Sequence, residues 1–138
     1  MKKVLVVDDD PDIVEFVTEL LKAHHYEVAS AENGRQGVEK ARQYRPDLVI
    51  LDLMMPDMHG FEVCQALRED PQLKDIRIIV SSGKRYQTDH RAADRLGADR
   101  FVAKPYKVAD MMGAVAALIG RPEDPLPALT KAPEPGRS

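Results

Sequence analysis

Residues 47–53 read Asp-Leu-Val-Ile-Leu-Asp-Leu (DLVILDL), and this stretch decides the fold. The four residues from Leu48 to Leu51 are all apolar, without the polar alternation expected of a strand that has one wet face. A short continuous apolar run of this kind is typical of a parallel strand buried on both faces. Because parallel strands are joined by crossover connections, helices should flank it along the chain.

The flanking segments supply those helices and further strands. Asp10 before Pro11 predicts the N-cap and first position of a helix, and Gly97 predicts a helix C-cap. Five strand-helix units in succession predict an α/β fold, with a parallel sheet covered by helices on both faces. The sequence predicts strands at 3–7, 27–31, 47–53, 76–81 and 100–103, and helices at 11–24, 34–44, 59–69, 86–96 and 108–119.

Composition excludes several function classes. At 138 residues the chain is about one domain, and its net charge of -3 predicts neither nucleic-acid binding nor attachment to a membrane surface. No apolar run approaches the roughly 20 residues of a membrane span, and the apolar stretch after Lys3 is too short for a secretory signal. The single cysteine, Cys64, fits a reducing cytoplasm, and we expect it to face the core.

The alternating pattern stops near Gly120. Five of the ten prolines fall in residues 122–138, where apolar residues are few. We therefore predict a folded domain over residues 1–120 and a proline-rich disordered tail or linker over residues 121–138.

Polar residues follow the carboxyl ends of the predicted strands. Asp8 and Asp9 follow the first, Asp52 the third, Ser82 the fourth and Lys104 the fifth. Strand ends of a parallel sheet meet at one rim, so we expect these side chains to converge there. The carboxylates offer the hard oxygen ligands that suit Mg²⁺, and the cation would offset their mutual repulsion. The lysine and the hydroxyl suit a phosphoryl group, which a carboxylate can accept as an aspartyl phosphate.

Four motifs, taken together and in this order, carry a family resemblance: VVDDD (6–10), LDLMMPDMHG (51–60), VSSG (80–83) and AKPY (103–106). Over residues 1 to about 120 the chain resembles a response-regulator receiver domain of two-component signalling, of the stand-alone chemotaxis type. The resemblance implies a flavodoxin-like doubly wound (βα)5 fold with strand order 2-1-3-4-5. It also implies a phosphorylated signalling module in the cytoplasm rather than an enzyme that turns over a substrate.

The resemblance implies roles for the residues around the acceptor. Asp52 is the phospho-acceptor, and a histidine kinase or phosphotransfer protein donates the group. Asp9 binds Mg²⁺ directly and Asp8 binds it through water. Asp52 and the backbone carbonyl of Met54 complete the protein's share of the metal shell. Met54 also occupies one of two positions that tune phosphate lifetime, and with Lys84 at the other we expect slow self-hydrolysis.

The resemblance implies further roles at the ends of the fourth and fifth strands. Ser82, chosen over Ser81 by its spacing from Asp52, and Lys104 contact the phosphoryl oxygens. The Lys104-Pro105 bond is expected to be cis, and Phe101 occupies the aromatic switch position. The signal would pass to a downstream target protein through the fourth helix, fifth strand and fifth helix. The molecule would be a monomer or a weak phosphorylation-dependent dimer.

Other readings stay open at this point. The chain could be a receiver fragment of a longer regulator, with an output domain beyond Ser138. Val7-Asp8-Asp9-Asp10 also fits the motif of haloacid-dehalogenase-like phosphatases, with Asp8 as nucleophile and Asp10 as general acid. That reading leaves Asp52 unexplained. A flavodoxin-type cofactor site is less favoured, since no phosphate-binding loop rich in Ser, Thr and Gly follows the first strand.

Overall fold

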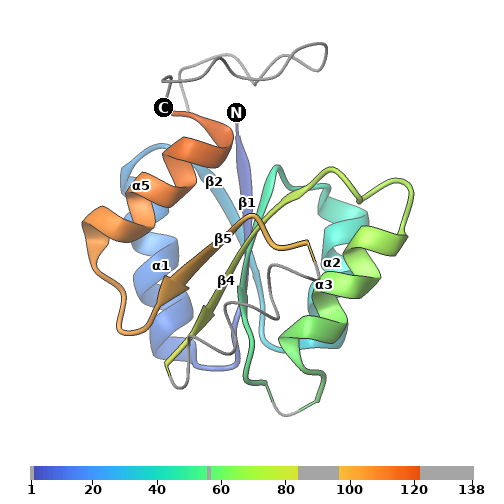
Figure 1. Ribbon diagram of the computed structural model, residues 1–138. Helices are drawn as coiled ribbons and strands as arrows, with labels where there is room; N and C mark the ends of the chain where they lie inside the picture. Colours follow the sequence, from blue (N-terminus) through green and yellow to red (C-terminus); the bar gives the residue numbers. More distant parts are fainter. Residues whose placement is uncertain (1, 56, 84–96, 122–138) are drawn as a thin grey trace.

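The computed structural model describes residues 2–55, 57–83 and 97–121. Within them, five parallel strands form one sheet between two layers of helices (Figure 1). The strand order is β2-β1-β3-β4-β5, so the predicted doubly wound fold is confirmed. The elements are β1 (Lys3–Val7), α1 (Pro11–Ala23), β2 (Glu27–Ala31), α2 (Gly34–Tyr44), β3 (Leu48–Asp52), α3 (Gly60–Glu69), β4 (Arg77–Ser82), β5 (Arg100–Ala103) and α5 (Val108–Ile119).

Two predicted segments fall wholly or largely outside the described residues. These are the helix expected over 86–96 and the tail expected over 121–138, of which only Arg121 is described. Gly97 has a φ of +91°, the left-handed conformation that favours glycine, but the helix it was expected to cap is not described.

The central strand β3 is buried along its whole length, as its apolar run predicts. It pairs in parallel with β1 on one side and β4 on the other. The predicted range 47–53 exceeds β3 by one residue at each end, and β4 is shifted one residue later than predicted. α1 ends at Ala23, because His24 leaves helical geometry and His25 has a φ of +71°. Strand and helix types were therefore correct in the described regions, while boundaries moved by one residue.

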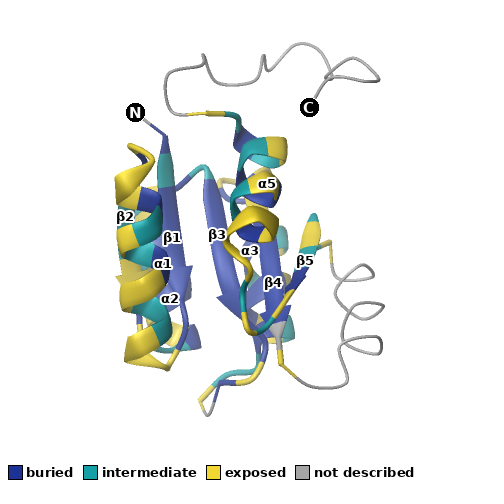
Figure 2. Ribbon diagram, turned by 90° about the vertical axis from the view of Figure 1, so that its left-hand side faces the viewer, coloured by how far each residue is buried: buried dark blue, intermediate teal, exposed yellow. Residues whose placement is uncertain are grey.

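Alternating side chains of the central strands divide the core into two clusters. Val6, Ile50 and Ile79 face α1 and α5, whereas Leu51 and Val80 face α2 and α3 (Figures 1 and 2). Cys64 of α3 is fully buried in the second cluster, as predicted. Among the residues that the structure describes, no helix has the length and hydropathy required to span a membrane.

The helix starts follow local sequence signals. The Asp10 side chain accepts a hydrogen bond from the Asp12 backbone N–H, and Pro11 is the first helical residue. Both features were predicted. At the amino end of β2, the Tyr26 hydroxyl donates to the Gly120 carbonyl at 2.7 Å and so anchors the end of α5.

Candidate functional site

Three carboxylates gather where β1 and β3 end. Asp8 and Asp9 directly follow β1, and Asp52 is the last residue of β3. One carboxylate oxygen of each lies within 4.8 Å of the others. Asp8 and Asp52 are buried, while Asp9 is exposed. The structure thus brings together the three carboxylates that the sequence placed at this rim.

Lys104 enters the same site from the end of β5. Its Nζ lies 2.9 Å from Oδ2 of Asp8 and 3.4 Å from Oδ1 of Asp52. The Lys104-Pro105 peptide bond is cis, as predicted. Burial alone would lower the pKa of Lys104, but the hydrogen bond to Asp8 and the charges of Asp52 and Asp8 outweigh it and raise the pKa. The side chain is therefore held in its ammonium form between two buried carboxylates.

At Asp52 the unfavourable effects on the charged form outweigh the favourable ones. Burial, and then the charge of Asp8, raise the pKa of Asp52 to about 6. The Lys104 ammonium lowers it, as does the Met54 backbone N–H, which donates to Oδ1 of Asp52 at 3.2 Å. The raised pKa means that the negative charge at Asp52 is only partly compensated by the protein.

The three consecutive aspartates have three different environments. Asp8 points inward, where its Oδ1 accepts the Asp10 backbone N–H at 2.9 Å and its Oδ2 accepts Lys104. Asp9 stays at the exposed rim, and the Asp10 side chain caps α1. The Lys104 ammonium pairs with Asp8 and Asp52, two of the three carboxylates, so negative charge remains for a cation to offset. An all-oxygen donor set of this kind fits Mg²⁺ or a similar hard divalent cation.

Some of the other predicted site residues lie within the described part of the structure, and others lie partly or wholly outside it. Ser82 ends β4, and its backbone pairs with Ala103, but its side chain is outside the described residues, as is all of Lys84. Phe101 lies on β5, half-buried against the core beside α2 and α3. Met54, two residues after the acceptor, is 59% exposed. The roles of these residues remain predictions.

One polar pair beside Asp52 was not predicted. Ser81 of β4 is fully buried and pairs in register with Asp52 of β3. Its hydroxyl lies 2.7 Å from the hydroxyl of Tyr106, two residues after Lys104. The alternation of side chains along a strand places Ser81 on the same face of the sheet as Asp52, so this part of the arrangement could have been predicted from the sequence. No local pattern, however, joins Ser81 to Tyr106, 25 residues away.

Two further residues of the loop after β3 were also missed. The Asp57 carboxylate accepts the backbone N–H groups of Gly34 and Arg35, at 3.0 and 3.1 Å, at the start of α2. The His59 ring accepts the Phe61 backbone N–H at 3.1 Å and caps α3. Since Asp57 acts on a helix 22 residues earlier in the chain, only the folded structure reveals its contact.

Comparison with known proteins agrees with this geometry. A family model described as the response regulator receiver domain matches residues 4–116. The DNA-binding response regulator MtrA of Mycolicibacterium smegmatis is 37% identical over 123 residues, which cover 89% of this chain and 53% of MtrA. Protein PilH of Pseudomonas aeruginosa is 34% identical over 119 residues, which cover 86% of this chain and 98% of PilH. The chain thus spans about half of MtrA but almost all of PilH.

Solved structures give the same result for the fold. The chemotaxis protein CheY4 of Vibrio cholerae superposes with a TM-score of 0.82 and 31% identity, covering 86% of this chain and 99% of CheY4. A receiver domain of the sensor histidine kinase PA1611 from Pseudomonas aeruginosa, with magnesium in its cleft, superposes with a TM-score of 0.78. At 23% identity, that second likeness concerns the fold alone.

Proposed function

Because the chain belongs to the response regulator receiver domain family, whose members are signalling domains, we propose that Asp52 accepts a phosphoryl group from a phosphohistidine. The donor is a histidine kinase or a phosphotransfer protein. The observation that carries the proposal is the position of Asp52: it ends the central strand, buried beside Asp8 and 3.4 Å from the Lys104 ammonium. A phosphatase using Asp8 and Asp10 is disfavoured, because the Asp10 carboxylate is engaged in capping α1.

The transfer requires Asp52 in its ionised form. An Asp52 oxygen forms the new bond to phosphorus as the phosphorus–nitrogen bond to the donor histidine breaks. The bonding electrons return to the imidazole nitrogen. The ring leaves as neutral imidazole if its other nitrogen carried a proton, and otherwise it takes up one proton at the nitrogen that held the phosphorus to become neutral. Lys104 lies close enough to Asp52 to offset charge on a phosphoryl oxygen attached there.

A divalent cation, when bound, would supply further positive charge for the phosphoryl oxygens. We propose that Asp9, Asp52 and the Met54 carbonyl hold Mg²⁺ directly. Asp8 already accepts hydrogen bonds from Lys104 and from the Asp10 backbone, which favours contact with the metal through water. The exposed carboxylate of Asp9 favours direct contact.

The phosphorylated protein signals through the surface of β5 and α5 together with the segment before β5, and a downstream protein binds there. We propose that Ser82 contacts a phosphoryl oxygen and that Phe101 changes its packing in response. With Met54 and Lys84 at the lifetime positions, the aspartyl phosphate is lost slowly. A groove supports this surface, lined among others by Arg100, Phe101, Ala103, Ala109, Gly113 and Ala117.

The setting of this signal follows the same reasoning. Cys64 is the single cysteine of the chain and is buried, which supports action in the reducing cytoplasm. We propose a protein target rather than direct contact of this domain with nucleic acid or a membrane, and a monomer or weak dimer whose association depends on phosphorylation. The match covers 98% of PilH but 53% of MtrA, so domains similar to this one make up nearly a whole protein in one case and half of a longer regulator in the other.

Intact mass after incubation with acetyl phosphate and Mg²⁺ tests the acceptor. We expect one phosphoryl group on the wild type, none on Asp52→Asn, and none when the metal is chelated. Asp10→Asn is the matched control, because asparagine also caps a helix and the variant should still be phosphorylated. A gain that survives Asp52→Asn but is lost in Asp8→Asn would contradict the proposal and support the phosphatase reading.

A further inference from the structure

We propose that Tyr106 is a positioning residue for Lys104, acting through the contact between its hydroxyl and that of Ser81. This inference rests on the proposed function, because Lys104 matters through the phosphoryl group and metal at Asp52. The Tyr106 hydroxyl contacts Ser81 rather than the carboxylates, and Tyr106 is separated from Lys104 by Pro105 alone. Its influence would come from fixing the turn that carries Lys104.

The first step of the argument is the location of Ser81. It pairs in register with Asp52 on one side and with Val102 on the other, in the middle of the sheet. It shares the face of Ile79, which packs toward α1 and α5. The Ser81 side chain is fully buried, and its backbone carbonyl accepts the Leu53 N–H at 3.0 Å. Ser81 is therefore a rigid point of attachment next to the acceptor strand.

The second step is how Tyr106 uses that point. The two hydroxyls lie 2.7 Å apart, and either can donate. The Tyr106 ring packs against the same core cluster as Ile79, so its hydroxyl reaches Ser81 from the interior. A buried serine hydroxyl gives up its hydrogen bonds to water when the protein folds. If it also loses the Tyr106 hydroxyl, it has no replacement for them, so the conformation that keeps the two hydroxyls bonded is favoured.

The third step is the consequence for Lys104. The segment from Lys104 to Tyr106 is fixed at one end by β5, which pairs with β4 up to Ala103. At the other end it is fixed by the hydroxyl pair. Between these two points the Lys104 ammonium lies 2.9 Å from Asp8 and 3.4 Å from Asp52. If the second attachment is removed, the turn gains freedom and the ammonium spends less time on the carboxylates.

Amine labelling of the full chain tests the position of Lys104 without metal or phosphate. An amine-reactive acylating reagent is applied briefly, and each lysine is quantified by peptide mass spectrometry, with exposed Lys22 as internal reference. We expect Tyr106→Phe and Ser81→Ala each to raise Lys104 labelling relative to Lys22 by about threefold to fivefold, the range for losing a contact of modest strength. The control Tyr26→Phe also removes a tyrosine hydroxyl bond, but at the opposite edge of the sheet, and should leave Lys104 labelling unchanged.

The double variant Ser81→Ala/Tyr106→Phe separates a specific pair from general damage. Because it leaves no unpaired hydroxyl, its labelling should be no higher than that of Ser81→Ala alone, so the two single effects should not add. Calorimetric titration with Mg²⁺ gives a second readout. A displaced ammonium competes less for Asp8 and Asp52, so Tyr106→Phe should bind Mg²⁺ more tightly, by up to about fivefold. The same change made in a Lys104→Met background should have no further effect.

The outcomes are distinguishable. Unchanged Lys104 labelling in Tyr106→Phe and Ser81→Ala would overturn the positioning role, and so would a uniform rise at every lysine, which indicates loss of fold. Weaker Mg²⁺ binding by Tyr106→Phe would likewise overturn it. If the wild type takes no phosphoryl group or metal, the proposed function fails, while the labelling ratio still decides whether Tyr106 holds Lys104.

Discussion

The Lys104 ammonium forms a 2.9 Å ion pair with Asp8, a residue 96 positions earlier in the chain. The pair joins the end of β5 to the end of β1 across the width of the acidic site. Only 3% of the Asp8 side chain is exposed, so the ammonium compensates a carboxylate that has lost most of its hydration. Asp52 lies 3.4 Å from the same ammonium, but burial and the charge of Asp8 still raise the pKa of Asp52 to about 6.

Asp52→Asn should stabilise the metal-free protein at neutral pH but not in acid. The pKa of Asp52 is about 6 in the folded protein and 3.8 ordinarily, so the folded state binds the proton more tightly. The contribution of Asp52 to stability therefore falls as pH rises from about 4 to about 6. At about pH 8 we expect the variant to gain on the order of 2 kcal/mol in free energy of unfolding.

Urea denaturation with a chelator present, followed across this pH range, measures the effect. The exposed residue Asp12 provides the control, since Asp12→Asn should show no comparable rise with pH. Saturating Mg²⁺ should reduce the difference in free energy of unfolding between wild type and Asp52→Asn, because metal bound to the wild type stabilises its folded state. If the difference in free energy of unfolding between the two proteins stayed constant from about pH 4 to about pH 8, the raised pKa of Asp52 would be contradicted.

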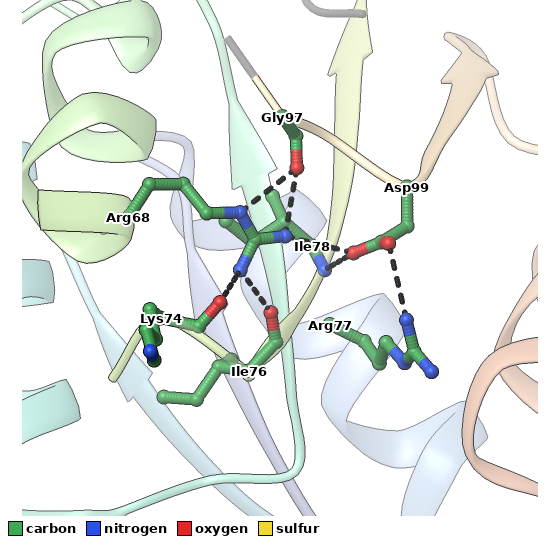
Figure 3. A network of polar contacts seen from close by, with 7 residues as sticks. All are labelled: Arg68, Lys74, Ile76, Arg77, Ile78, Gly97 and Asp99. Carbon is green, nitrogen blue, oxygen red and sulfur yellow. Dashed lines mark hydrogen bonds and ion pairs between the residues drawn. The ribbon is translucent and has the colours of Figure 1, made fainter. Parts of the chain in front are cut away.

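Arg68→Met should destabilise the fold by about 2–4 kcal/mol. The guanidinium of Arg68 joins α3 to the segments that precede β4 and β5 (Figure 3), at the amino ends of these two strands. It donates to the backbone carbonyls of Lys74, Ile76 and Gly97 and forms a 2.9 Å ion pair with Asp99. Its removal leaves a half-buried carboxylate and several carbonyls with fewer donors.

Arg68→Lys should recover little of that stability, because a lysine ammonium cannot reproduce the planar fork of donors. Arg42→Met is the matched control, since Arg42 forms a 3.3 Å pair with Asp70 and its side chain is 56% exposed. We expect the control to cost less than about 1 kcal/mol. Urea denaturation of the three variants gives the comparison, and equal losses for Arg68→Met and Arg42→Met would refute it.

Two glycine-to-alanine substitutions should change the stability of the fold in opposite directions. A Cβ at Gly60 would lie 2.6 Å from Leu53 Cα and 2.7 Å from the Asp52 carbonyl oxygen, both backbone atoms directly at the acceptor. We expect Gly60→Ala to cost about 1–3 kcal/mol, the range for overpacking. A Cβ at Gly113 in α5 would meet nothing within 4 Å, so Gly113→Ala should gain about 0.5–1 kcal/mol from helix propensity. Thermal denaturation of both variants checks the signs, and stabilisation by Gly60→Ala would be the contrary result.

Asp57→Ala should loosen the start of α2. The Asp57 carboxylate satisfies the N–H groups of Gly34 and Arg35, while Asn33 satisfies that of Gln36. Burial tends to raise the pKa of Asp57, but the backbone N–H donors outweigh it and lower the pKa, so the carboxylate stays charged at neutral pH.

We expect a loss of about 1 kcal/mol, as for other caps. Amide hydrogen exchange at Gly34 and Arg35 should quicken more than exchange in the middle of α2. Glu39→Ala, at an exposed position of the same helix, should leave these two amides unchanged. Equal exchange in wild type and Asp57→Ala would show that the contact does not hold the helix start.

Local patterns in the sequence predicted much of the fold. The apolar run at 48–51 indicated a doubly buried parallel strand, and Asp10-Pro11 indicated a helix start, because both depend on interactions within a few residues. Boundaries were less accurate: the end of α1 depends on the left-handed conformation of His25, which no periodicity indicates. The strand order came from family resemblance rather than from the periodicity.

The sequence by itself determined which residues reach the carboxyl rim of the sheet, because strand ends are local features and parallel strands share one direction. Only the tertiary structure decided how those residues pair. Lys104 lies against Asp8, Tyr106 against Ser81 and Asp57 against the start of α2. Each of these contacts joins separate elements, so its geometry depends on strand order, register and helix packing together rather than on any stretch of neighbouring residues.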